Sequence, residues 1–339
     1  MRATSIVLAT AAIVSTTAAS AVPVITQTVF ATPPAGASAP DSITLGAGSV
    51  WVSYAGGTDS TGVKPGNSTI VRYAPNGTAQ TTFSFAGSVD GLNYNRFNNT
   101  VWALQNQDGY SSQQIIKAAD NSVTSRTYAQ TSPGNGYDEA AFTKNGTFLS
   151  YTNPAAPTDA IVRQLVPGNP IPVTDTVTLG QTGLTAFDAD SLKVAPNGID
   201  LIQSGGDQGT LLLIHAPGTT AQTIRVLALT AGGQAVSGLD DTAYFTAASG
   251  TLYATQTKSN QVLAFNLSGL TKGSLIASIG SLNEIAFVDP NTGALTPFAT
   301  DLPGVHGLAF VPNQVPEPAA IALLGLGLTA TLARRRRRR

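Results

Sequence analysis

An acidic residue or a histidine heads the same short pattern six times along this chain of 339 residues. In every copy an aliphatic residue or alanine follows two positions later, and a hydrophobic residue follows four positions later. The residues that head the six copies are Asp41, Asp90, Asp138, Asp190, Asp241 and His306, at intervals of 49, 48, 52, 51 and 65 residues. If these carboxylates converge, they offer the oxygen ligands that calcium prefers, about six to eight in number. The alternative is that each aspartate caps its own turn by accepting backbone N–H hydrogen bonds.

The elements that position these residues are predicted to be short β-strands. From residue 22 to residue 313 the hydrophobic pattern has a period of two, and Gly, Pro, Asn or Asp interrupts it every 8–12 residues. Four strands in about 50 residues, repeated six times, predict an all-β chain folded as a six-bladed β-propeller, with seven blades as the alternative. Because innermost propeller strands line a central channel, the six head residues are expected to form a ring at one mouth of that channel.

The end of the repeat array is irregular. We assign Leu252-Tyr253 and residues 262–265 to the second and third strands of the fifth repeat, and extra strands near residues 274–280 to the long last interval. Only residues 311–313 follow the innermost strand of the sixth copy. The sixth blade must therefore borrow strands, and residues 24–30 near the N-terminus are the expected source.

The composition excludes several classes of protein. There is no cysteine, so a disulfide framework, a thiolate zinc site and a catalytic cysteine are excluded. Between residues 22 and 316 there are 11 Lys and Arg against 18 Asp and Glu, which gives 11 − 18 = −7. Such an acidic body argues against nucleic acid as a partner and favours a cation or a neutral glycan.

The first 21 residues are predicted to be a secretory signal peptide that forms a helix and is not part of the propeller. Arg2 precedes an apolar run, and Ala19-Ser20-Ala21 supplies small residues at a cleavage site. The propeller then spans residues 22–313, and residues 314–339 form a separate C-terminal segment.

The C-terminal segment has three parts. The motif Val315, Pro316, Glu317 and Pro318 comes first, and an uncharged run at residues 319–333 is predicted to be a short transmembrane helix. The last residues are Arg334, Arg335, Arg336, Arg337, Arg338 and Arg339. An arginine cluster stays on the cytoplasmic side of a membrane, so the body is expected outside.

This three-part tail resembles the PEP-CTERM sorting signal of Gram-negative bacteria. The resemblance implies that an exosortase-type membrane protease recognises and removes the tail, after a transient stage in which the tail anchors the chain in the inner membrane. The body would then reach the cell envelope or an exopolysaccharide matrix. A permanently retained anchor is the alternative.

The repeated blades resemble the regucalcin-like lactonases and the NHL-type propellers. Asp90-Gly91-Leu92 and residues 196–199 (Pro-Asn-Gly-Ile) carry this resemblance. In the lactonase group, acidic and Asn residues at channel-facing strand starts bind a divalent metal, and an Asp serves as the base. The resemblance therefore implies a calcium-dependent hydrolase that uses the ring of aspartates.

Three hypotheses for the function follow. The preferred one is a non-catalytic propeller exported to the cell surface or biofilm matrix, where it binds an exopolysaccharide or an envelope protein. The lactonase-like hydrolase is the second, and a structural matrix protein without a defined ligand is the third. The sequence indicates no catalytic residue directly, although His306 could serve as a general base or a ligand. The sequence establishes no cofactor. Ca²⁺ is the candidate for the ring, and Asp240 beside Asp241 could widen such a metal site.

Overall fold

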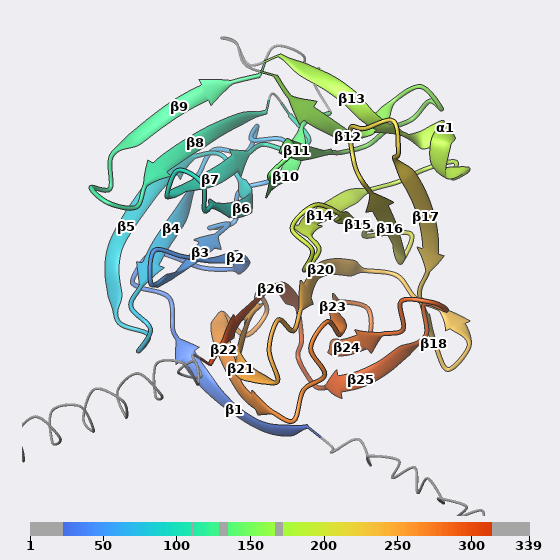
Figure 1. Cartoon of the computed structure of the whole chain (residues 1–339). Coiled ribbons are helices and arrows are strands. Elements are labelled where there is room, and N and C mark those ends of the chain that lie inside the picture. The colour runs from blue at the N-terminus through green and yellow to red at the C-terminus, as the bar shows by residue number, and fades with distance from the viewer. Residues whose placement is uncertain (1–22, 110, 129–134, 167–171, 314–339) are drawn as a thin grey trace, which may run out of the picture.

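Six four-stranded antiparallel sheets surround a central channel in the computed structural model, which describes residues 23–109, 111–128, 135–166 and 172–313 (Figure 1). The described part of the chain is therefore a six-bladed β-propeller, as the repeats predict. The predicted signal peptide and the three parts of the C-terminal segment lie outside the described residues. Within those residues the one helix, α1 (Leu179–Thr182), is too short to cross a membrane.

The first four blades are each built from four consecutive strands, counted from the channel outwards. Blade 1 contains β2 (Pro40–Gly46), β3 (Ser49–Tyr54), β4 (Asn67–Tyr73) and β5 (Ala79–Ala86), and blade 2 contains β6 (Val89–Asn95), β7 (Thr100–Gln105), β8 (Ser112–Lys117) and β9 (Val123–Thr127). Blade 3 contains β10 (Tyr137–Thr143), β11 (Gly146–Tyr151), β12 (Ala160–Leu165) and β13 (Val173–Thr178). Blade 4 contains β14 (Ala189–Val194), β15 (Leu201–Gly205), β16 (Thr210–His215) and β17 (Thr223–Ala228). A small hairpin, β18 (Thr230–Ala231) and β19 (Gln234–Ala235), follows.

The fifth and sixth blades exchange strands. Blade 5 contains β20 (Leu239–Tyr244), β23 (Leu275–Ile279), β24 (Glu284–Val288) and β25 (Leu295–Ala299). Blade 6 contains β26 (Val305–Pro312), β21 (Ser249–Gln256), β22 (Gln261–Ser268) and β1 (Val24–Ala31). The prediction that Leu252-Tyr253 and residues 262–265 complete the fifth repeat is therefore wrong, because both segments belong to the sixth blade. The long interval before His306 is explained by this exchange, since it supplies two strands to blade 6 and three to blade 5.

The N-terminal strand closes the ring, as expected from the sequence. β1 pairs antiparallel with β22 from Val24–Ser268 to Ala31–Val262, with an irregularity near its end. Most of β1 is exposed because it forms the outer edge of blade 6.

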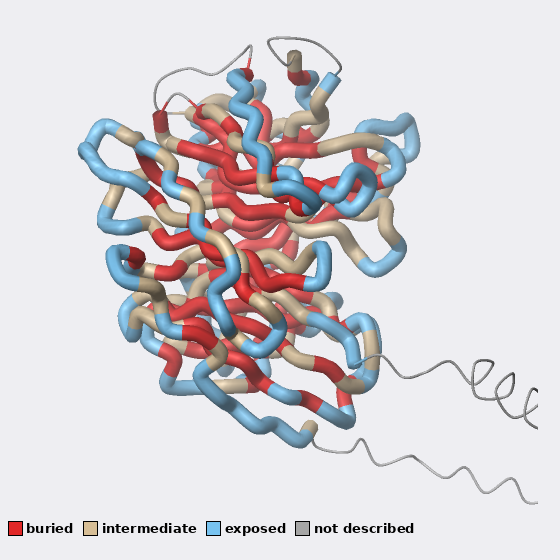
Figure 2. The backbone as a smooth tube through the Cα atoms, turned by 90° about the vertical axis from the view of Figure 1, so that its left-hand side faces the viewer, coloured by how far each residue is buried: buried red, intermediate tan, exposed pale blue. Residues whose placement is uncertain are grey.

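Hydrophobic clusters between neighbouring blades form the core. Trp51 of blade 1 is fully buried with Leu92 and Val101 of blade 2, and the equivalent Trp102 packs against Phe142 of blade 3 with ring centroids 4.8 Å apart. Figure 2 shows the buried residues along the stacked strands and the exposed ones in the loops. The tryptophans thus pack between blades, and this packing holds the inner strands in a fixed ring.

Candidate functional site

A β-bulge begins every inner strand at the same place. In blade 1, Pro40 pairs with Tyr54 and Ile43 with Val52, so Asp41 and Ser42 oppose the single residue Ser53. The other five blades show the same register shift. A bulge re-aims the side chains of its extra residue. Its first position is occupied in the six blades by Asp41, Asp90, Asp138, Asp190, Asp240 and His306.

Buried serines on the second strands stabilise these bulges. Ser150 Oγ accepts a hydrogen bond from the Glu139 backbone N at 2.7 Å and donates to its carbonyl at 3.4 Å. Ser53, Ser204 and Ser278 make the same pair of contacts in blades 1, 4 and 5, and all four serines have 0% exposure. Each serine thereby satisfies backbone groups that the bulge removes from the ladder.

The Ser150→Ala substitution is expected to destabilise the protein by about 1–3 kcal/mol, because it leaves a buried N–H without an acceptor. Denaturant unfolding measures the change. The matched control is Ser125→Ala on the outer strand β9, where an exposed hydroxyl bonds to Gln114 and the change should stay within about 0.5 kcal/mol. Equal losses in the two variants would contradict the role of the bulge serine.

The second bulge position connects neighbouring blades. Ser42 Oγ accepts a hydrogen bond from the Leu92 backbone N at 3.1 Å. Glu139 Oε2 accepts one from Leu192 N at 2.7 Å, and Asp241 Oδ2 accepts one from Leu308 N at 2.6 Å. The side chains at this position therefore link the inner strand of one blade to that of the next.

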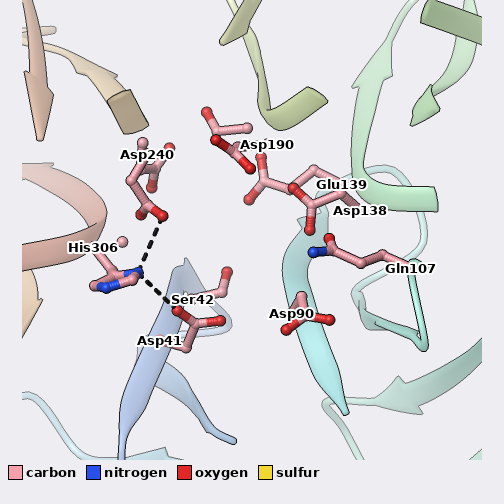
Figure 3. Close-up of a pocket in the computed structure, with 12 residues that line it drawn as sticks. Asp41, Ser42, Asp90, Gln107, Asp138, Glu139, Asp190, Asp240 and His306 are labelled. Atoms are coloured by element: carbon pink, nitrogen blue, oxygen red, sulfur yellow. Dashed lines mark ion pairs between the residues drawn. The ribbon is translucent and has the colours of Figure 1, made fainter. Parts of the chain in front are cut away.

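The structure brings all six predicted head residues to one cavity at the channel mouth, with a volume of about 220 Å³ (Figure 3). The register assigns the first bulge position of blade 5 to Asp240 and places Asp241 one residue deeper. Glu139 and Gln107, which the repeated pattern does not predict as site residues, also line the cavity. Two adjacent acidic residues, Asp138 and Glu139, indicate this part of the site in the sequence. Nothing in the sequence around Gln107, which follows β7, indicates a role at the mouth.

His306 neutralises one side of the mouth. Its Nδ1 lies 3.1 Å from Asp41 Oδ1 and 3.1 Å from Asp240 Oδ1 (Figure 3). The negative charge of Asp240, with the hydrogen bonds to both carboxylates, raises the pKa of His306 to about 11 although burial opposes the shift. His306 is thus protonated at neutral pH, and it serves as a counter-cation for two carboxylates rather than as a general base.

Lys193 neutralises a second pair of carboxylates deeper in the channel. Its Nζ lies 2.9 Å from Glu139 Oε1 and 3.0 Å from Asp241 Oδ1, and both carboxyl side chains are 5% exposed. Burial raises the pKa of Glu139 to about 7, against the lowering effect of Lys193. We call Glu139, Lys193 and Asp241 the channel triad. The repeated pattern does not predict Lys193 as a site residue.

Three carboxylates, from blades 2, 3 and 4, have no cationic partner among the described residues: Asp90, Asp138 and Asp190. Burial, followed by the charge of Asp41, raises the pKa of Asp90 to about 7. Burial also raises the pKa of Asp138 and of Asp190 well above the usual range. Asp90 Oδ2 and Gln107 Oε1 are buried in the cavity without a hydrogen-bond partner in the described part of the chain. We call these three aspartates the unpaired carboxylates.

The mouth does not fit a directly coordinated metal ion. Within the described ranges, no three carboxylate or imidazole groups are arranged so that they could hold one. His306 and Lys193 already form ion pairs with four of the carboxylates.

The described fold and its channel define a six-bladed β-propeller with an acidic mouth. The chain also carries a recognised sorting sequence, since residues 314–338 match the PEP-CTERM protein-sorting motif. This motif is the recognition signal for exosortase processing, so the chain is an exported protein sorted by that route.

Several solved structures are similar to the chain over most of its length. A protein of unknown function from Bacteroides caccae is 12% identical, with 81% of this chain and 87% of that chain covered and a TM-score of 0.53. The periplasmic gluconolactonase of Pseudomonas aeruginosa is 13% identical, with coverages of 80% and 88% and a TM-score of 0.47. A putative 6-phosphogluconolactonase from Bacteroides uniformis is 16% identical, with coverages of 78% and 85% and a TM-score of 0.46. No curated protein matches the chain.

Proposed function

We propose that the protein is a binding protein of the cell envelope or surrounding matrix, and that its propeller holds a ligand through a primary ammonium group. The sorting motif supports the location. The ligand class is supported by the chemistry of the mouth, where carboxylates outnumber the hydroxyl and amide groups of Ser42, Ser191 and Gln107. An exopolysaccharide with free amino groups has this chemistry.

The observation that carries the proposal is Asp138. Asp138 is 7% exposed, and among the described residues its carboxylate neither pairs with a cation nor accepts a hydrogen bond. A buried carboxylate without a partner is costly. An ammonium group has a positive charge and three N–H donors, so it can hydrogen-bond to Asp138 within the field of the neighbouring carboxylates Asp190 and Asp90.

The test is the melting temperature of the purified protein with glucosamine and with N-acetylglucosamine, whose amine is blocked. Glucosamine at a hundred times its dissociation constant should stabilise the wild type by about 2.7 kcal/mol, and N-acetylglucosamine should have no effect. Asp138→Asn should remove the response. The matched variant Asp120→Asn, an exposed surface carboxylate, should keep it.

Other outcomes separate the alternatives. A rise with calcium that a chelator reverses, and none with glucosamine, would favour the metal-dependent hydrolase over our proposal. That alternative has less support, because the described carboxylates do not form a metal site. No response to any cation would leave a structural matrix protein without a defined ligand.

Deleting residues 314–339 is expected to abolish exosortase-dependent processing and to change where the propeller accumulates. Cell fractionation followed by immunoblotting measures both. Asp138→Asn serves as the control, because it alters the mouth and leaves the tail intact. Normal processing and location of the deletion variant would contradict the sorting role of the tail.

A further inference from the structure

A second cavity, of about 400 Å³, lies at the opposite end of the channel, where the inner strands finish. A volume of this size falls within the usual range of small-molecule sites. Hydrophobic residues from the ends of all six inner strands form its wall, which we call the apolar ring: Leu45, Tyr94, Phe142, Val194, Tyr244 and Phe310. Phe142 is buried and the other five are half-buried, so the ring presents apolar surface to the cavity.

The floor of this cavity offers hydrogen-bond donors that a ligand could use. Lys193 lines it from below, and its ammonium has three N–H bonds, of which two face the carboxylates of the channel triad. Asn93 is 7% exposed, and its Oδ1 accepts a hydrogen bond from Ala140 N at 2.8 Å, which leaves its Nδ2 as a donor. Thr242 is 1% exposed, and its hydroxyl has no partner among the described residues.

The rim of the cavity carries one exposed cation. Arg96 stacks on Phe97, with its guanidinium carbon 5.0 Å from the ring centroid, and it pairs with no carboxylate in the described part of the chain. None of the described residues that line this cavity is acidic. The two ends of the channel therefore have opposite chemistry, with carboxylates at one end and apolar and cationic groups at the other.

We propose that this second cavity binds a small amphiphilic anion. The apolar body of the ligand lies against the apolar ring, its carboxylate pairs with Arg96, and an acceptor at its far end meets the donors of the floor. Because the channel triad separates the two cavities, this site is independent of the ammonium site at the acidic mouth.

The experiment is isothermal titration calorimetry of the full-length protein with 4-hydroxycinnamate and with 4-hydroxycinnamyl alcohol, which keeps the body and lacks the charge. We expect the carboxylate to bind at least fivefold more tightly than the alcohol. Arg96→Gln should remove this preference, and the matched variant Arg126→Gln, an exposed arginine on the outer strand β9, should keep it. Asp138→Asn should bind as the wild type does.

Four results would overturn the proposal. The first three are the absence of saturable binding, equal binding of the acid and the alcohol, and an equal effect of Arg96→Gln and Arg126→Gln. The fourth is loss of binding in Asp138→Asn, because that would place the ligand at the acidic mouth. Ala309→Phe, which fills the cavity from its half-buried wall, should abolish binding, and near-UV circular dichroism shows whether that variant is folded.

Discussion

Lys193→Met is expected to lower the free energy of unfolding by about 3–5 kcal/mol, because it removes the only cation of a buried ionic group. The variant leaves Glu139 and Asp241, with 4% and 3% exposure, facing one another without a positive charge between them. The loss should extend over several blades. Both carboxylates also accept backbone hydrogen bonds from the next inner strand, so a shift of either one disturbs the ring.

A triple variant separates the charge effect from the packing effect. Glu139→Gln and Asp241→Asn keep acceptor oxygens for the Leu192 and Leu308 N–H groups, and combined with Lys193→Met they leave no buried charge in the channel triad. Replacing a whole buried ionic group is often close to neutral. Denaturant unfolding should therefore find the triple variant more stable than Lys193→Met. Equal stability of the two would contradict the account.

The protein is expected to be more stable near pH 5 than at pH 8. The pKa values of Asp90 and Glu139 are raised to about 7 by burial, whereas in the unfolded chain they return to 3.8 and 4.5. Between those values the folded state binds more protons than the unfolded state, so stability falls as the pH rises. His306 acts in the same direction, because its pKa is raised from 6.5 to about 11. Its contribution to the stability of the folded state is fully present below pH 6.5 and is lost as the pH rises through 11.

One pKa unit corresponds to about 1.4 kcal/mol, so a single carboxyl with a pKa near 7 supplies about 3 kcal/mol between pH 8 and pH 5. For a domain of this size that is a rise of about 6 °C in the melting temperature. Asp90→Asn should reduce the rise, and the exposed Asp120→Asn should not. Below about pH 4 the trend should reverse, since hydrogen bonds lower the pKa of Asp59, Asp120 and Asp289. A melting temperature that is flat or lower at pH 5 would contradict the prediction.

The repeat pattern predicted the blades and the mouth because it recurs with residues of similar chemistry at similar intervals. The assignment of Asp241 to the first ring position is off by one residue because both Asp240 and Asp241 are acidic, and the fully buried Phe245 lies four positions after Asp241, which matches the repeated pattern. A bulge has no signature in hydrophobic alternation. The serine that supports it in blade 3, Ser150, follows Glu139 by 11 residues and is visible only when strands are paired.

Lys193 stands out in the sequence when the six inner strands are aligned. The equivalent positions in the other inner strands hold small or neutral residues: Thr44, Asn93, Ala141, Ala243 and Ala309. A charged residue at one such position indicates a buried partner. The strand exchange of blades 5 and 6 could not be predicted in the same way, because β21 and β23 show similar hydrophobic character and alternation does not identify a partner strand.

The strand exchange also determines when the ring can be completed during folding. Thr28 in β1 donates a hydrogen bond to the Ala264 carbonyl, 236 residues later in the chain, and β26, which pairs with β21, follows all four strands of blade 5 in the chain. β1 thus waits for a partner strand, β22, that is synthesised much later, whereas blades 1 to 4 are each assembled from consecutive segments. Contacts of such long sequence separation slow folding. The assembly of blade 6 from β1, β21, β22 and β26 is therefore expected to be the final step of folding, and the ring is expected to open first at this blade.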